Sequence, residues 1–197
     1  KATVQKVNMD NNQRSNIGYL GRASYSYDDR YFFTGSYRRD GASVFGVNQK
    51  WGDFFAFGGA WRLSSEKFMS SISYLDDLKL KLSWGKNGNQ GLDPYGTLST
   101  INNGASGGVR YEFGGSDIIY GLNQKALGNA NLGWETTESW NTGFESAWLG
   151  SRLFVDLDLY FSKTTDQIFT RDIPVMTGFK NMKSSMGQVN NLSLIHI

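Results

Sequence analysis

The chain has 197 residues, a formal net charge of +2 and no cysteine. The small net charge argues against a nucleic-acid partner, and the absence of thiols excludes a disulfide scaffold and thiolate metal sites. Aromatic residues reach 15% and there are 24 glycines against 2 prolines, a composition that favours many closely approaching strands.

The first predicted element is a hairpin over residues 16–40. Two alternating runs, 16–27 and 31–40, are joined by the polar link Asp28-Asp29-Arg30. Aromatic and small residues occupy the odd positions of both runs, and mostly polar residues occupy the even positions. Because side chains alternate across a strand, each run has one apolar and one polar face. The short polar link predicts a hairpin but leaves the turn geometry open.

Four further alternating runs follow in chain order, and they cover residues 51–64, 78–84, 136–149 and 153–162. A short helical turn is expected near residues 64–69, with Ser64 or Ser65 as its cap. The segment 85–133 is rich in Gly and Asn and is predicted to be one long loop. After Lys163 the chain is expected to be polar and irregular.

The connections between the runs alternate in length. The links at Asp28 and Gly150 are short, whereas those after Asp40 and Gly85 are long. Transmembrane barrels have this layout, and a loop as long as 85–133 is unusual in a compact soluble domain. A strand of about ten residues tilted by about 45° also matches the apolar band of such a barrel, about 25 Å tall. The sequence therefore predicts an all-β, antiparallel up-and-down transmembrane β-barrel fragment of about six strands.

Alternation alone leaves a soluble β-sandwich, for example a carbohydrate-binding module, as the alternative. In a sandwich the leucines of run 153–162 would form the core, whereas in a barrel they would meet lipid. Aromatic residues gather near the ends of the runs, as an interfacial girdle requires. The barrel interpretation makes the polar side chains lumen-facing, and the candidates are Arg22, Arg38, Arg62, Asp156, Asp158 and Tyr160. The alternative role for the arginines is structural pairing with nearby acids.

No catalytic, cofactor or metal site is predicted. The chain has no cysteine and a single histidine, which argues against a nucleophilic triad and a His-based metal site. Asp156 and Asp158 share a face and could in principle serve glycoside hydrolysis, but a solvated polar face is the preferred interpretation. Four aromatic residues of the predicted loops are candidates either for stacking on a sugar ligand or for packing the loops down: Tyr95, Tyr111, Tyr120 and Trp134.

Several short stretches, in the same order, resemble the SusC/RagA family of TonB-dependent outer-membrane transporters over roughly residues 14–190. The most informative are Arg38-Arg39-Asp40-Gly41-Ala42-Ser43, Gly59-Ala60-Trp61-Arg62-Leu63-Ser64, Leu132-Gly133-Trp134-Glu135-Thr136-Thr137 and Lys163-Thr164-Thr165-Asp166. The departures are single positions. Ala42 stands where the family has Ser, and the usual Pro near Ala130 and basic residue near Gly133 are missing.

The resemblance implies a 22-stranded barrel with an N-terminal plug in the cell outer membrane. Such a receptor imports glycans or peptides with a SusD-like surface lipoprotein and couples to TonB through the plug. Residues 1–191 would then form a partial barrel without the plug, taken from the later part of the fold. Lys1 is expected to follow an internal cut, because the first residues of the chain do not have the basic-then-apolar pattern of a signal segment. Residues 192–197 resemble the translation of a sequencing adapter and are expected to be a non-native tail.

Overall fold

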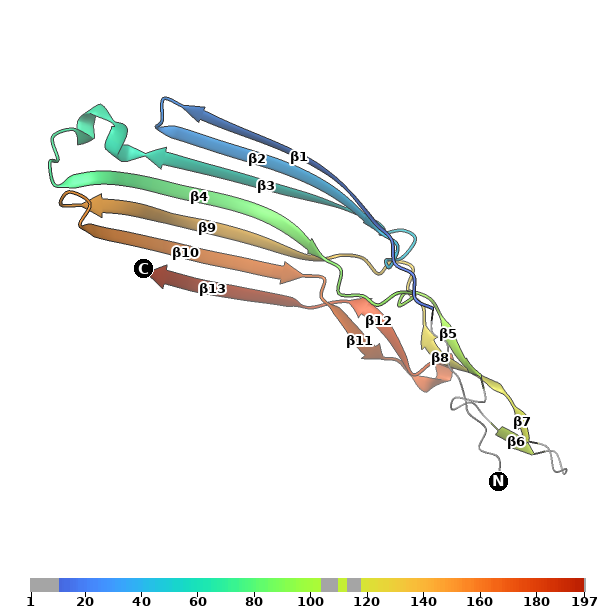
Figure 1. Cartoon of the computed structure of the whole chain (residues 1–197). Helices are drawn as coiled ribbons and strands as arrows, with labels where there is room; N and C mark the ends of the chain where they lie inside the picture. The colour runs from blue at the N-terminus through green and yellow to red at the C-terminus, as the bar shows by residue number, and fades with distance from the viewer. Residues whose placement is uncertain (1–10, 104–109, 113–117, 197) are drawn as a thin grey trace, which may run out of the picture.

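The computed structural model describes residues 11–103, 110–112 and 118–196. Its main element is a seven-stranded antiparallel sheet in the order β1-β2-β3-β4-β9-β10-β13, drawn as one curved layer in Figure 1. The strands are β1 (Asn16–Tyr27), β2 (Tyr31–Ala42), β3 (Trp51–Arg62), β4 (Leu75–Asn89), β9 (Glu135–Trp148), β10 (Leu153–Thr165) and β13 (Gln188–His196). The order follows the chain, so the up-and-down prediction is confirmed.

Two small sheets extend beyond one end of the main sheet (Figure 1). One has the order β11-β12-β8-β5, and β6 and β7 form a separate pair. Their strands are β5 (Thr100–Asn103), β6 (Arg110–Glu112), β7 (Ile118–Tyr120), β8 (Leu122–Leu127), β11 (Ile168–Asp172) and β12 (Asn181–Ser185). The prediction of one continuous loop over 85–133 was wrong here, as was the irregular chain after Lys163. Strands of three to six residues are too short to show alternation, and β12 pairs with β8 from a distant part of the sequence.

The short connections gather at the other end of the main sheet. Asp28 and Asp29 both have positive φ, 53° and 49°, and the Arg30 amide donates to the Tyr27 carbonyl at 3.0 Å. This is the type I′ geometry that matches strand twist, and Asp tolerates it better than most side chains. The link between β3 and β4 carries two 3-10 turns, η1 (Leu63–Ser65) and η2 (Lys67–Met69). Neither has a side-chain cap, so the predicted serine cap is not formed.

The register divides the main sheet into an apolar face and a polar face. One row of cross-strand partners on the apolar face is Tyr25, Phe33, Gly59, Leu82, Thr142, Leu159 and Leu194. The neighbouring row on the polar face is Ser24, Thr34, Gly58, Ser83, Asn141, Tyr160 and Ser193. Tyr25, Phe33 and Leu82 are 62%, 56% and 54% exposed, whereas Asn141 and Tyr160 are half-buried. The more exposed face is thus the apolar one, the reverse of a soluble domain.

A sealed sandwich interior would require the apolar residues of different strands to be covered. Trp61, Leu80 and Trp140 instead remain exposed, and no second sheet of the described residues lies over them in Figure 1. The β-sandwich alternative is therefore not the fold of this chain. Within the described ranges, no helix has the length and apolar character needed to span a membrane.

The buried core is small and lies at the end of the sheet that carries the long connections. It consists of Ala42, Val44, Phe45, Phe54, Leu92, Leu132 and Trp134. The Trp134 ring centroid lies 4.6 Å from that of Phe45 and 5.3 Å from that of Phe54. A Cβ on Gly88 would come within 2.1 Å of the Phe54 ring, so a glycine there makes room for the cluster. The cluster fastens the segments before β3, after β4 and before β9 to the sheet.

Candidate functional site

The polar face carries all six predicted lumen-facing side chains. Arg22 pairs in register with Ser36, and Arg38 pairs with Phe54. Directly paired residues share a face, and the same reasoning places Arg62, Asp156, Asp158 and Tyr160 on the polar face. The structure thus brings the six onto one face. That this face lines a lumen stays a prediction.

An ion-pair cluster joins three strands near the short turns. Lys81 of β4 lies 2.8 Å from Glu145 of β9, measured from Nζ to Oε1. The same Nζ lies 3.5 Å from Asp156 and 3.6 Å from Asp158, both on β10. Lys79 adds a contact of 3.9 Å to Glu145. Asp156 and Asp158 therefore share one cation, and this accounts for the two carboxylates as ion-pair partners within the wall.

Two of the predicted arginines take the structural role. The Arg38 Nε lies 2.7 Å from an Asp40 carboxylate oxygen, but its N–H is not aimed at that oxygen, so the contact is ionic. The Arg38 guanidinium also lies 5.6 Å from the centre of the Phe54 ring, a cation–π distance. Arg62 lies 3.6 Å from Asp77. Arg22 makes no ion pair with the described part of the chain.

The middle of the polar face is lined by hydroxyl and amide groups. Ser139 and Tyr160 share a hydrogen bond of 3.3 Å, and Thr137 and Thr164 share one of 2.9 Å. Asn141 lies between the first pair and the charged cluster. Such groups both donate and accept hydrogen bonds, so this stretch can bind polar solutes without a charge.

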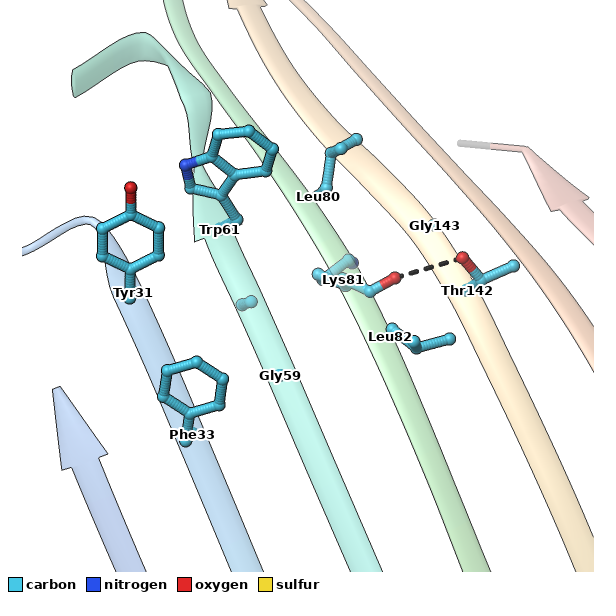
Figure 2. Close-up of a pocket in the computed structure, with 10 residues that line it drawn as sticks. Tyr31, Phe33, Gly59, Trp61, Leu80, Lys81, Leu82, Thr142 and Gly143 are labelled. Atoms are coloured by element: carbon cyan, nitrogen blue, oxygen red, sulfur yellow. Dashed lines mark hydrogen bonds between the residues drawn. The ribbon is translucent and has the colours of Figure 1, made fainter. Parts of the chain in front are cut away.

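The apolar face has a groove of about 370 Å³ near its turn end, shown in Figure 2. Gly59 leaves a gap between the rings of Phe33 and Trp61. The Thr142 hydroxyl donates to the Lys81 carbonyl of the neighbouring strand at 3.3 Å. The lining is almost wholly apolar, in contrast to the opposite face of the same strands.

Aromatic rings with polar tips border this groove at the turn end. Tyr31 and Trp61 stack with centroids 6.2 Å apart. The Tyr31 hydroxyl donates to Glu66 at 2.7 Å, and the Trp61 indole N–H donates to the same oxygen at 3.1 Å. These hydrogen bonds, first that from Tyr31 and then that from Trp61, lower the pKa of the Glu66 carboxyl. Rings that are apolar at the base and polar at the tip are typical of a membrane interface.

The four loop aromatics divide into different environments. Tyr95 is 48% exposed, has a φ of 63° and lines a cavity of about 400 Å³ together with Lys50 and Thr97. Trp134 is only 8% exposed and packs the chain down, the second of the two roles considered for it. Phe45 and Phe54 lie against its ring, and its ligand-contact role stays a prediction. The backbones of Tyr111 and Tyr120 lie in β6 and β7, and their side chains lie outside what the structure describes.

Two functional features went unpredicted. The Lys79-x-Lys81 alternation marks a polar face, but the sequence does not show that β9 and β10 supply the carboxylates around Lys81. Glu66 was predicted as part of a helical turn, and its role as acceptor for the Tyr31 hydroxyl and the Trp61 indole was not predicted. In the described ranges, no group of three or more His, Cys, Asp or Glu side chains is placed to hold a metal ion.

The family described as TonB dependent receptor-like, beta-barrel matches residues 2–192. The TonB-dependent receptor SusC of Bacteroides thetaiotaomicron is 35% identical over 182 residues, which are 90% of this chain and 18% of SusC. The TonB-dependent receptor P39 of Formosa agariphila is 36% identical over 170 residues, 86% of this chain and 16% of P39.

Solved structures of transporters and receptors also superpose on most of this chain. A chain of the RagAB peptide importer in its open-open state superposes with a TM-score of 0.78 at 25% identity, covering 92% of this chain and 19% of that one. The siderophore receptor PirA from Pseudomonas aeruginosa superposes with a TM-score of 0.57 at 13% identity, covering 93% of this chain and 30% of PirA, a likeness of fold alone. The chain spans less than a fifth of the length of SusC, P39 and the RagAB chain.

Proposed function

The chain belongs to the TonB-dependent receptor β-barrel family, and from this premise we propose that it forms part of the wall of a SusC/RagA-type importer in the cell outer membrane. The whole receptor would import glycans or peptides. This segment would line the passage and contact the solute, without covalent chemistry. One observation carries the proposal. Along the middle of the main sheet the exposed face is apolar, whereas the ion-pair cluster around Lys81 and the row of hydroxyl and amide groups lie on the opposite face.

The energetics of the two faces support this orientation. Apolar surface left in water costs about 25 cal/mol for each Å², so a sheet with Phe33, Phe57 and Leu82 outward is favoured where lipid replaces water. The cluster around Lys81 would then face the wet interior of the barrel, as charged lumen residues do in this class of protein. Lipid also requires every backbone group to be paired, which a closed barrel provides for β1 and β13.

The partners of the whole receptor are proposed from the resemblance. A SusD-like surface lipoprotein would sit over the end of the sheet that carries the long connections, where the segment would also meet the solute. Tyr95 would contribute a ring to that contact, and Tyr111 and Tyr120 remain candidates beside it. TonB would act through the plug region of the whole receptor.

The proposal is tested with the complete receptor that carries this chain. Cells with the receptor, cells without it and cells lacking TonB are incubated with a mixture of oligosaccharides and peptides, and depletion of each solute is followed by mass spectrometry. The proposal expects depletion of one solute class only when both receptor and TonB are present, and a surface lipoprotein that co-purifies with the receptor. Identical depletion in all three strains would overturn it.

A further inference from the structure

A trough crosses the middle of the polar face above strand β3. It is made of two adjoining hollows of about 610 Å³ and 290 Å³. Four residues line both of them: Thr34, Gly58, Ser83 and Asn141. The hollows form because the middle of β3 presents the small residues Ala56, Gly58 and Ala60 to this face, while the neighbouring strands present longer side chains. This feature is called the β3 trough below.

The middle of the β3 trough carries hydroxyl and amide groups but no charge, beside the apolar side chains of Leu20 and Phe32. Ser36 and Ser83 form no side-chain hydrogen bond with the described part of the chain, and the same holds for Asn141. Their donors and acceptors are therefore available to a bound molecule. Charges lie only at the two ends, with Arg22 at one and Lys81 with Asp158 at the other.

We propose that the β3 trough holds the imported solute during its passage along the wall, and that it takes an uncharged chain rich in hydrogen-bonding groups. This inference rests on the proposed function. Each hydrogen bond that such a chain makes with water can be replaced by one to a hydroxyl or amide group of the trough. A charged group would lose hydration there without meeting an opposite charge, which is costly. Sugar hydroxyls and peptide amides share this chemistry.

Two adjacent glycines provide a matched pair of variants. A Cβ on Gly58 would have Ser83 Cβ as its nearest neighbour at 3.9 Å, and a Cβ on Gly59 would have the Phe32 carbonyl oxygen at 3.9 Å. Both positions thus have room for a side chain. Tryptophan in Gly58→Trp fills the β3 trough, whereas tryptophan in Gly59→Trp fills the groove of Figure 2 on the other face. Ser83→Trp and its outward neighbour Leu82→Trp form a second pair.

Uptake is measured in the complete receptor, after equal amounts of each variant have been found in the outer-membrane fraction. The probes are neutral and acidic oligosaccharides from polysaccharide hydrolysates, and peptides with blocked termini, made with and without charged side chains. We expect receptor-dependent uptake of uncharged solutes, lowered about tenfold in Gly58→Trp, which corresponds to roughly 1.4 kcal/mol of lost interaction. Gly59→Trp should import at the wild-type rate. The second pair is used in the same way if Gly58→Trp fails to assemble.

The outcomes separate this inference from the function on which it rests. Equal uptake by both variants of a pair would overturn the role of the β3 trough and leave the importer intact. Receptor-dependent uptake confined to charged solutes would overturn the solute class. Absence of receptor-dependent uptake in the wild type would overturn the proposed function itself. Uptake confined to the oligosaccharide arm or the peptide arm identifies the source of the hydrogen-bonding chain.

Discussion

The Lys81 ammonium lies 2.8 Å from the Glu145 carboxylate across the β4–β9 pair. The two strands are separated in the sequence by residues 90–134, whose described part includes strands β5, β6, β7 and β8 of the other sheets. Asp156 and Asp158 of β10 complete the cluster. One cation therefore holds carboxylates from two neighbouring strands on the polar face.

Replacing the cation should destabilise this part of the wall. In Lys81→Met the three carboxylates lose their shared partner and repel one another, so we expect a loss of about 1 kcal/mol, the upper end for partly exposed pairs. The measurement is chemical unfolding of the complete receptor in detergent at low and high salt. Lys86→Met, on the other face, is the control. A loss that does not shrink in high salt would contradict the electrostatic explanation.

Adjacent positions on β9 should respond very differently to arginine. Thr142 belongs to the apolar row and Asn141 to the polar row, and both side chains are short. Arginine in Thr142→Arg would meet lipid near the middle of the band and should cost about 2–4 kcal/mol. Asn141→Arg should stay within about 0.5 kcal/mol of the wild type. Folding into lipid vesicles measures both, and equal costs would show that the faces are assigned wrongly.

The aromatic cluster should control the order of the long connection. Trp134→Ala removes the ring that packs on Phe45 and Phe54, and losses of about 3–5 kcal/mol are usual for a buried Trp. Gly88→Ala should act in the same direction, because a Cβ there meets the Phe54 ring at 2.1 Å. Limited proteolysis of residues 90–134 is the readout. Tyr95→Ala, at an exposed ring, is the control and should leave the cleavage rate unchanged.

The Glu66 contact makes a pH-dependent contribution to stability. Its pKa is lowered by the hydrogen bonds from Tyr31 and Trp61, so the folded protein binds this proton less tightly than the unfolded chain, whose Glu pKa is about 4.3. The contribution is fully present above that value and is lost as pH falls through the lower folded pKa. At pH 7 the melting temperature of the wild type should be higher than that of Glu66→Gln, and the two temperatures should converge at low pH. A difference that persists unchanged in acid would refute the role of the carboxylate.

Local pattern was enough to predict the strands that pair with their sequence neighbours. The hairpin of β1 and β2 has strict alternation and a short polar link, and its first strand has the predicted bounds. The seventh strand, β13, was missed, and it includes residues 192–196, which were predicted to be a non-native tail. That origin stays a prediction, because pairing with β10 does not depend on where the residues come from.

Features set by distant contacts could not be predicted. β4 continues to Asn89 because β9 pairs with its Gly- and Asn-rich end, although residues 85–89 have no strand-like side-chain pattern. Trp134 is buried because Phe45, from another connection, covers it. The six candidate side chains were placed on one face by alternation alone, whereas their partners, such as Lys81, depend on which strands lie side by side.

The orientation of the two faces is tested most directly with single cysteines, because this chain has none of its own. Leu82→Cys and Ser83→Cys are introduced separately into a complete receptor cleared of other accessible thiols, and each is treated in the membrane with a water-soluble maleimide. The barrel wall described here predicts labelling of the Ser83→Cys thiol and protection of the Leu82→Cys thiol. Protection of Ser83→Cys with labelling of Leu82→Cys would contradict it.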